Sequence, residues 1–379
     1  MRFSARSAFE DADDGVEVAT AREGVHDLTV TNPSKAGLSS DSYEPEPLGM
    51  NGARVAVASH YARRGHVVDV DNIVLSASTS EAYAWLFKLL TDPGDAVLVP
   101  TPSYPLFECL AELESIRLVR YALARDEHFR VDVGAIERAL DAEPRARAIV
   151  VVAPNNPTGT VVFEEDARAI EALAARRELP VIVDEVFADY LDPTVDATAL
   201  RSSWASSKVA LTFVLSGLSK VLCASGAKLG WTLVRGPHAM EREALRRLSV
   251  IADTYLSVSS RVQRDLGDLL LTTDLVQREV RARLEANRAI AREITVATDG
   301  LVHVLPAHGG WSMILEVPRV MSDVTWTREL ETAGVRVQAG SLFDLRGERS
   351  LVVSLLPDPE VFRAGMTLLC ATVVAFSRE

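Results

Sequence analysis

The sequence predicts an α/β fold, in which a three-layer, doubly wound and mostly parallel sheet is followed by a smaller α+β domain. From about residue 71 onward, short β-branched runs alternate with longer runs of helical spacing, which is typical of a sheet covered by helices on both faces. The runs 148–152 and 180–183 are apolar throughout, as expected of central strands. A chain of 379 residues that is 48% hydrophobic can bury a large core and still form a second unit.

The order of the predicted elements gives the domain boundaries. In the first part, we expect strands at 72–75, 96–99, 148–152 and 180–183 and helices at 81–90 and 164–177. Helices follow at 240–252 and 266–294, of which the second is long and rich in Arg and Glu and suits a connector. Beyond it, we expect strands near 302–305, 312–317 and 351–355 and helices near 325–333 and 360–375. The chain therefore divides into an amino-terminal arm (1–42), a large domain (43–275) and a small carboxyl-terminal domain (276–379).

The composition argues against several classes of protein. A formal net charge of −13 and a pI near 5.1 argue against a nucleic-acid partner, because such binding needs a basic surface. The three cysteines lie far apart without Cys-x-x-Cys spacing, so neither a disulfide framework nor a metal site is indicated. The first residues lack the apolar core of a signal peptide, and no run reaches the roughly 18 apolar residues of a membrane helix. We expect a cytoplasmic protein with no membrane partner.

Lysine is scarce, and one lysine occupies a position that suits chemistry. Lys220 ends the segment 216–220, just after the apolar run 211–215. Burial at the end of a strand disfavours the ammonium form and lowers the pKa of the amine toward nucleophilic competence. A surface lysine on a loop is the alternative, and the neighbouring motifs decide between the two.

Two segments that follow predicted strands could hold an anion and a planar ring. Ser78, Thr79 and Ser80 lie between a strand and a helix, where free backbone N–H groups can bind a phosphate. A plain helix cap is the alternative at that point. Tyr104 lies in a proline-rich loop and could stack on a planar ring or simply anchor the loop.

Two further segments place polar groups at the ends of buried strands. Asn156 precedes Pro157, which favours an extended backbone and lets the amide point over the sheet edge, although a turn without function is the alternative. Asp184 ends a buried strand, where a carboxylate needs a partner such as the protonated nitrogen of a pyridine ring. All these segments stand where an open α/β sheet binds ligands, outside the carboxyl ends of its strands.

Together these strings resemble the fold-type I enzymes that depend on pyridoxal 5'-phosphate, and specifically the class I and II aminotransferases. The resemblance rests on Pro-Asn-Asn-Pro-Thr-Gly at 154–159, on Asp184-Glu185, and on Ser-x-x-Ser-Lys ending at Lys220. It implies that Lys220 forms an imine with the cofactor and carries protons in catalysis, and that Asp184 pairs with the ring nitrogen. It also implies that Asn156 bonds the phenolic oxygen and that Tyr104 stacks on the ring.

The same resemblance implies a phosphate site and a dimer. Ser78, Thr79 and Ser80 match the turn that cradles the phosphate. Tyr43 is similar to a tyrosine that reaches the phosphate of the neighbouring subunit, so the resemblance implies a homodimer with shared active sites.

Four positions depart from the family pattern. Gly217 stands where a small hydroxyl residue is common, with Ser216 and Ser219 as possible replacements. Lys228 replaces an arginine that grips the phosphate, which keeps the charge but loses the bidentate geometry. Phe187 replaces a tyrosine that bonds the phenolic oxygen. Val352 stands where the family has an arginine that binds the substrate carboxylate. Three other cations of this chain are candidates for that missing charge, namely Lys35, Arg261 and Arg336.

The sequence therefore predicts an aminotransferase that moves an amino group from an amino acid to a 2-oxo acid by a ping-pong mechanism. A lyase, replacement or cyclisation enzyme of a biosynthetic pathway is the alternative on the same scaffold, which the departures at Phe187 and Val352 favour. A ligand-sensing regulatory module is a third possibility, which the intact Lys220 disfavours.

Overall fold

The computed structural model describes residues 1–9, 28, 31–38, 43, 45–125, 128–345, 347 and 349–378. Within these residues, the large sheet consists of β1 (Ile73–Ser76), β2 (Ala96–Thr101), β3 (Arg117–Ala124), β4 (Arg130–Val131), β5 (Ala146–Val152), β6 (Val181–Asp184), β7 (Thr212–Gly217) and β8 (Gly230–Arg235). Their order across the sheet is β1-β8-β7-β6-β5-β2-β3-β4. The strands from β7 to β3 run parallel, whereas β8 and β4 run antiparallel to their neighbours. The predicted mostly parallel α/β sheet is confirmed.

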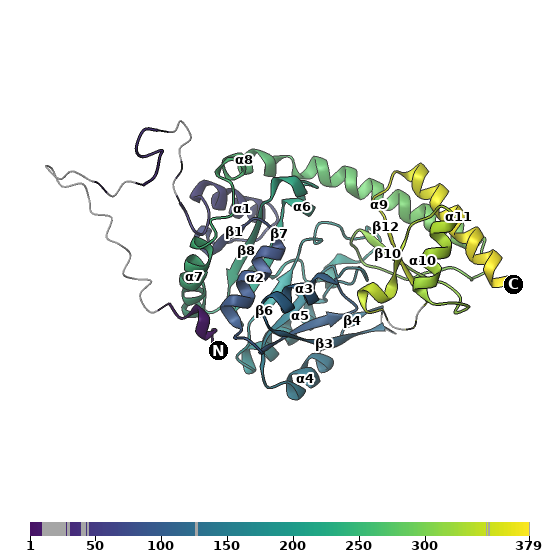
Figure 1. Cartoon of the computed structure of the whole chain (residues 1–379), viewed down its shortest axis with the longest axis horizontal. Coiled ribbons are helices and arrows are strands. Elements are labelled where there is room, and N and C mark those ends of the chain that lie inside the picture. Colours follow the sequence, from purple (N-terminus) through teal and green to yellow (C-terminus); the bar gives the residue numbers. More distant parts are fainter. Residues whose placement is uncertain are drawn as a thin grey trace.

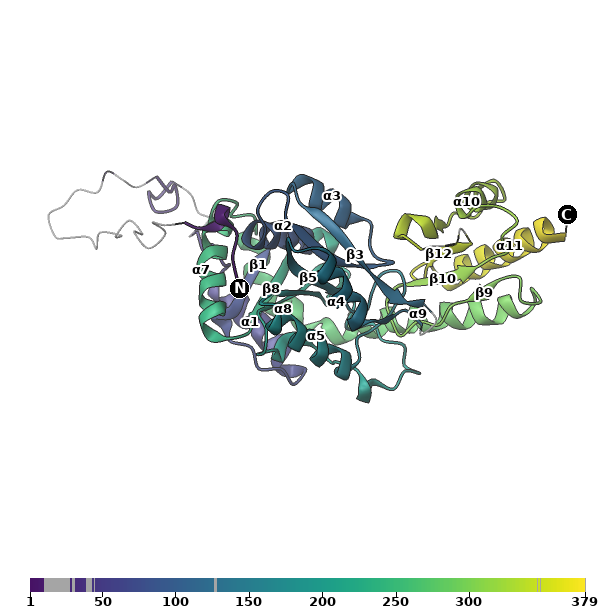
Figure 2. The ribbon, with the colours of Figure 1, turned by 90° about the horizontal axis from the view of Figure 1, so that it is seen from below.

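Helices cover both faces of this sheet. One face carries α2 (Thr79–Leu90), α3 (Leu106–Leu113) and α7 (His238–Asp253), and the other carries α1 (Asn51–Arg63), α4 (Val133–Ala142), α5 (Glu164–Arg176) and α8 (Ser260–Leu271). Figure 2 shows α2 and α3 on one side and α4 and α5 on the other. In β5, Ile149 and Val151 pack into one core and Val150 into the opposite one. A strand buried on both faces needs apolar residues at every position, which explains the apolar run.

A long helix, α9 (Thr273–Val296), leads from the large sheet to a smaller unit (Figure 1). This unit has an antiparallel sheet in the order β11-β12-β10-β9, built from β9 (His303–Val304), β10 (Ser312–Glu316), β11 (Gln338–Ala339) and β12 (Ser350–Ser354). The helices α10 (Asp323–Thr332) and α11 (Pro359–Arg378) complete it. The single helix expected over 266–294 is wrong, because the chain ends α8 at Leu271 and restarts at Thr273. The Thr272 hydroxyl and N–H there both donate to the Leu269 carbonyl.

By length and composition alone, α11 is apolar enough to cross a membrane. One side of it, including Phe362, Met366 and Leu369, is buried in the core of the small unit. Arg363 on the same helix forms an ion pair with Glu293 of α9 at 2.8 Å. These contacts are those of a helix that packs on a globular core.

Candidate active site

The predicted strand-end residues line one cavity at the carboxyl edge of the large sheet. The cavity and its open mouth contain about 930 Å³ of empty space. Its lining residues are Ser78, Thr79, Ser80, Tyr104, Phe107, Val152, Asn156, Asp184, Val186, Phe187, Gly217, Ser219, Lys220, Ser225, Leu229 and Gly230. They meet because β2, β5, β6 and β7 are parallel, so their carboxyl ends share one edge.

Lys220 lies in a short helix, α6 (Leu218–Val221), directly after β7. Its Nζ lies 5.5 Å from the ring centre of Phe187 and 5.0 Å from that of Trp311. The hydroxyl of Tyr190 donates to the Lys220 carbonyl over 2.5 Å, which fixes the backbone. Burial lowers the pKa of Lys220, and the negative charge of Asp184 offsets part of this effect. A lowered pKa increases the fraction of neutral, nucleophilic amine.

Asp184 is held at the end of β6 by two hydrogen bonds. The Val186 N–H donates to Oδ1 over 3.1 Å, and the Tyr83 hydroxyl donates to Oδ2 over 3.2 Å. Burial raises the pKa of Asp184 to about 6, although both hydrogen bonds and Lys220 favour its charged form. A buried carboxylate that is oriented but poorly solvated is a good partner for a ligand group that donates an N–H.

The amino end of α2 offers the cavity a site for an anion. Ser78 caps the helix by accepting the Glu81 N–H over 3.1 Å, and the Glu81 carboxylate accepts the Ala77 N–H over 2.6 Å. The helix is therefore capped, although the Glu81 carboxylate binds Ala77 instead of the capping residue itself, and Ser78 also lines the cavity. The first N–H groups of a helix have no partner inside it, and the helix dipole favours negative charge there. Strand β8 passes close by, since a Cβ on Gly230 would lie 3.4 Å from the Thr79 nitrogen.

Tyr104 and Asn156 lie at the wall between the large and small units. Tyr104 is 45% exposed, and Asn156 Oδ1 accepts a hydrogen bond from Ser312 of β10 over 3.4 Å. The neighbouring Asn155 is buried and donates to the Pro102 carbonyl over 3.0 Å and to Thr158 over 2.9 Å. Asn155 thus fixes the loop, which leaves Asn156 free to face the cavity.

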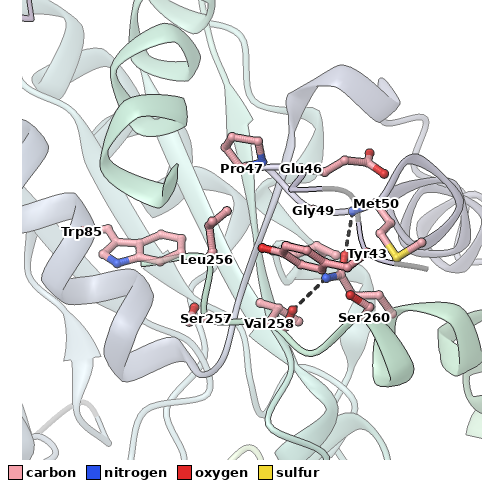
Figure 3. A pocket seen from close by; sticks show the side chains of 12 residues that line it. Tyr43, Glu46, Pro47, Gly49, Met50, Trp85, Leu256, Ser257, Val258 and Ser260 are labelled. Atoms are coloured by element: carbon pink, nitrogen blue, oxygen red, sulfur yellow. Dashed lines mark hydrogen bonds between the residues drawn. The ribbon is translucent and has the colours of Figure 1, made fainter. Parts of the chain in front are cut away.

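Lys228, Val352 and Tyr43 are among the residues singled out in the sequence that lie outside the cavity wall. Lys228 is exposed, with a left-handed backbone (φ 52°, ψ 53°), although its neighbour Leu229 lines the cavity. Val352 is 1% exposed and lies in the apolar core. Tyr43 lines a different pocket, together with residues such as Leu256 (Figure 3).

Tyr43 is 40% exposed at the edge of the large unit. Figure 3 shows it beside the chain around Val258, next to the amino end of α1. There the Met50 N–H donates to Gln263 over 2.6 Å, and Gln263 donates to the Val258 carbonyl over 3.0 Å. These bonds tie the segment before α1 to the start of α8.

Several residues around the cavity were missed from the sequence. Tyr83 lies one turn after Thr79 on α2, and Phe107 lies on α3. Trp311 contacts Lys220 from the small unit, so only tertiary packing reveals it. The glycine pair before Trp311 marks this close packing, since a Cβ on Gly309 would lie 2.5 Å from the Tyr190 carbonyl oxygen.

The fold and the site together define a class of protein, and comparisons with known proteins agree. The family model described as aminotransferase class I and II matches residues 45–364. The chain belongs to this family, as the sequence resemblance indicated.

Individual relatives are distant. The glutamate-pyruvate aminotransferase AlaA of Escherichia coli is 29% identical over 246 residues, which are 64% of this chain and 60% of that protein. The chain thus matches less than two thirds of that protein's length. The tyrosine aminotransferase of Bos taurus is 27% identical over 80% of this chain and 69% of its own. The solved alanine aminotransferase of Pyrococcus furiosus superimposes with a TM-score of 0.78 over 91% of this chain and 86% of its own, at 24% identity, which shows a shared fold.

Proposed function

We propose that this chain is a pyridoxal-phosphate-dependent aminotransferase, which moves an amino group from a donor to a carbonyl acceptor in two half-reactions. An amino acid and a 2-oxo acid are the pair that the resemblance implies. The observation that carries the proposal is the meeting of Lys220, Asp184 and the amino end of α2 in one cavity. Family membership supports it, because class I and II aminotransferases generally depend on this cofactor.

The residues present fit the cofactor. Asp184 would hold the ring nitrogen, and the α2 amino end with Ser78, Thr79 and Ser80 would hold the phosphate. Tyr104 and Asn156 also line the cavity. Tyr104 would contact the face of the ring, and Asn156 would contact the phenolic oxygen. When bound, the group supplies an electron sink for the carbon that loses its proton.

The chain's own residues would bind, orient and move protons. The amine of Lys220, whose pKa burial lowers, would take a proton from the substrate carbon and return it to the product. The rings of Phe187 and Trp311 both lie close to the Lys220 amine and would keep water away from it. Asp184, which Val186 and Tyr83 orient through the two hydrogen bonds described above, would accept the N–H of the ring nitrogen.

Borohydride reduction followed by peptide mass mapping tests this proposal. We expect purified protein to carry a visible cofactor band and reduction to attach the cofactor to Lys220. Lys220→Ala should lose the attachment and at least about a thousandfold in activity. Lys208→Ala, at an exposed lysine outside the cavity, should change neither. Attachment elsewhere, or none, would contradict the proposal.

The products of the first half-reaction distinguish transfer from elimination. With a donor and no acceptor, we expect one carbonyl product per active site and conversion of the cofactor to its amine form. Continuous release of ammonia would instead identify a lyase.

We further propose that the protein works as a cytoplasmic homodimer in which Tyr43 reaches the cofactor phosphate of the second subunit. The exposed side chains of Tyr43, Tyr255 and Leu256 near one pocket support such a contact. Mixing Tyr43→Ala protein with Lys220→Ala protein should restore activity, because one mixed site would have both groups. Failure of the mixture, with each variant folded, would contradict shared sites.

A further inference from the structure

The charge of the Lys220 cavity restricts the compounds that it can hold. Among the lining residues, all of which belong to the described part of the chain, Lys220 and Asp184 are the charged ones. The rest are apolar, aromatic, hydroxyl or amide side chains, or glycine. Lys220 is the reacting amine itself, so the described wall offers no second cation to an anionic substrate.

The chain next to the cavity is apolar at Val352, the position where the family has an arginine that binds the substrate carboxylate. Val352 pairs in register with Ile314, and both pack in a buried cluster with Phe343 and Leu345. The Phe343 carbonyl accepts the Ser103 N–H over 3.1 Å, so this cluster borders the loop that carries Tyr104.

None of the cations suggested from the sequence joins the described lining. Lys35 and Arg261 lie at exposed positions, and Arg336 pairs with Glu331 at the surface over 2.7 Å. Arg288 faces another cavity, where it lies 3.6 Å from Asp192.

A carboxylate that enters this cavity would leave water without gaining a cation from the described wall. An amine with an apolar chain avoids this cost and contacts Phe107, Val186 and Leu229. We propose that the preferred amino donor is a primary arylalkyl or alkyl amine whose reacting carbon carries no carboxylate. This inference rests on the aminotransferase function proposed above.

The reaction balances without any oxidant. The donor carbon loses its C–N bond and becomes the carbon of an aldehyde, while its amino group forms a C–N bond with the carbon of the acceptor carbonyl. The acceptor loses its carbonyl oxygen as water, and water supplies the oxygen of the aldehyde. The two hydrogens and two electrons given up by the donor are taken up by the acceptor.

Matched donors test the proposal on the purified holoenzyme. 2-Phenylethylamine and phenylalanine differ only by the carboxylate, and single-turnover conversion of the cofactor band measures each. We expect the ratio of the single-turnover rate constant to the dissociation constant to be at least tenfold higher for the amine. A charged hydrogen bond changes a binding constant by a factor of about this size. Equal constants, or a preference for phenylalanine, overturn the proposal while the aminotransferase function stands. Conversion by neither donor also overturns the proposal, whereas cofactor attachment at Lys220 and the half-reaction products decide the aminotransferase function.

A variant and a binding measurement separate charge from shape. Val352→Arg should shift the donor preference toward phenylalanine by at least tenfold, whereas Val352→Leu, which adds volume without charge, should not. Calorimetry with 3-phenylpropionate, which has a carboxylate and no amine, should detect binding to Val352→Arg and none to the wild type. Tight binding of this acid to the wild type overturns the proposal. If Val352→Arg does not fold, the wild-type donor comparison and acid titration still decide.

Discussion

Tyr83 donates its hydroxyl hydrogen to Oδ2 of Asp184 over 3.2 Å. The donor lies on α2 and the acceptor at the end of β6, so the helix whose amino end faces the cavity also orients the carboxylate. The phenol is buried between two other rings, 5.2 Å from that of Phe107 and 5.9 Å from that of Phe87. Packing therefore fixes the direction of this hydrogen bond.

Replacing Tyr83 by Phe should move the pH dependence of activity. The hydrogen bond favours the charged form of Asp184, so its loss should raise the pKa of that carboxyl above about 6. We expect the midpoint of the acid limb of the pH profile to move to higher pH by about one unit, because the free energy of a hydrogen bond to a charged group corresponds to about one pKa unit. The measurement is kcat/KM from pH 5 to 9.

Tyr121→Phe is the matched control for this change. Tyr121 is a buried phenol whose hydroxyl donates to the Val150 carbonyl over 2.7 Å, not to Asp184. Its loss should lower stability and leave the acid limb in place. An unchanged limb in Tyr83→Phe would show that Asp184 does not control it.

Asp184 should also give the cofactor-free protein a distinctive stability profile. Its pKa is raised from 3.8 to about 6 in the folded state, so between these values the folded chain binds more protons than the unfolded chain. The contribution of Asp184 to the free energy of unfolding is therefore fully present below about pH 4 and is lost as the pH rises through about 6. Asp184→Asn should remove this loss, which amounts to at most about 3 kcal/mol.

Urea unfolding of both proteins at pH 4.5 and pH 7 measures this effect as a difference. Glu185, whose pKa burial also raises to about 6, is present in both proteins and cancels. A constant difference between the two pH values would show that Asp184 titrates normally.

Gly159 should tolerate no side chain. Its φ is +67°, and a Cβ there would lie 2.3 Å from the Gly309 carbonyl oxygen. We expect Gly159→Ala to cost at least about 2 kcal/mol of unfolding free energy, because strain and clash add. Gly365→Ala is the control, since no atom lies within 4 Å of its Cβ position in α11. It should gain up to about 1 kcal/mol, and equal effects in a thermal melt would contradict this account.

The sequence predicts the place of a site residue best where that place depends on a single strand. Asp184, Asn156 and Lys220 each follow an apolar run, and parallel strands bring such positions to one edge whatever the rest of the chain does. The meeting of these residues in one cavity could therefore be predicted, while their roles toward a cofactor stay predictions.

Contacts between elements distant in sequence could not be predicted in the same way. Trp311 reaches Lys220 only because the loop before β10 packs on Tyr190, and Tyr83 reaches Asp184 only through the packing of α2. The run 230–235 mixes Trp, Thr and Arg with apolar residues, so its place as β8 inside the sheet depends on neighbours. The position of Val352 was predicted as a departure, but its burial among apolar side chains follows from β12 pairing with β10.

Lys228 offers the last prediction, because its charge and its backbone can be tested separately. Its left-handed backbone is exposed and its side chain does not join the cavity lining. We expect Lys228→Asn and Lys228→Gly to weaken cofactor binding equally and by less than about fivefold, as for a solvated charge. Lys228→Gly should raise the unfolding free energy by about 1 kcal/mol and Lys228→Asn by less, because glycine adopts this conformation without strain and asparagine with little. Cofactor titration and urea unfolding measure the two effects. A loss of binding above about thirtyfold in both variants would show that Lys228 holds the phosphate directly, as the family resemblance implies.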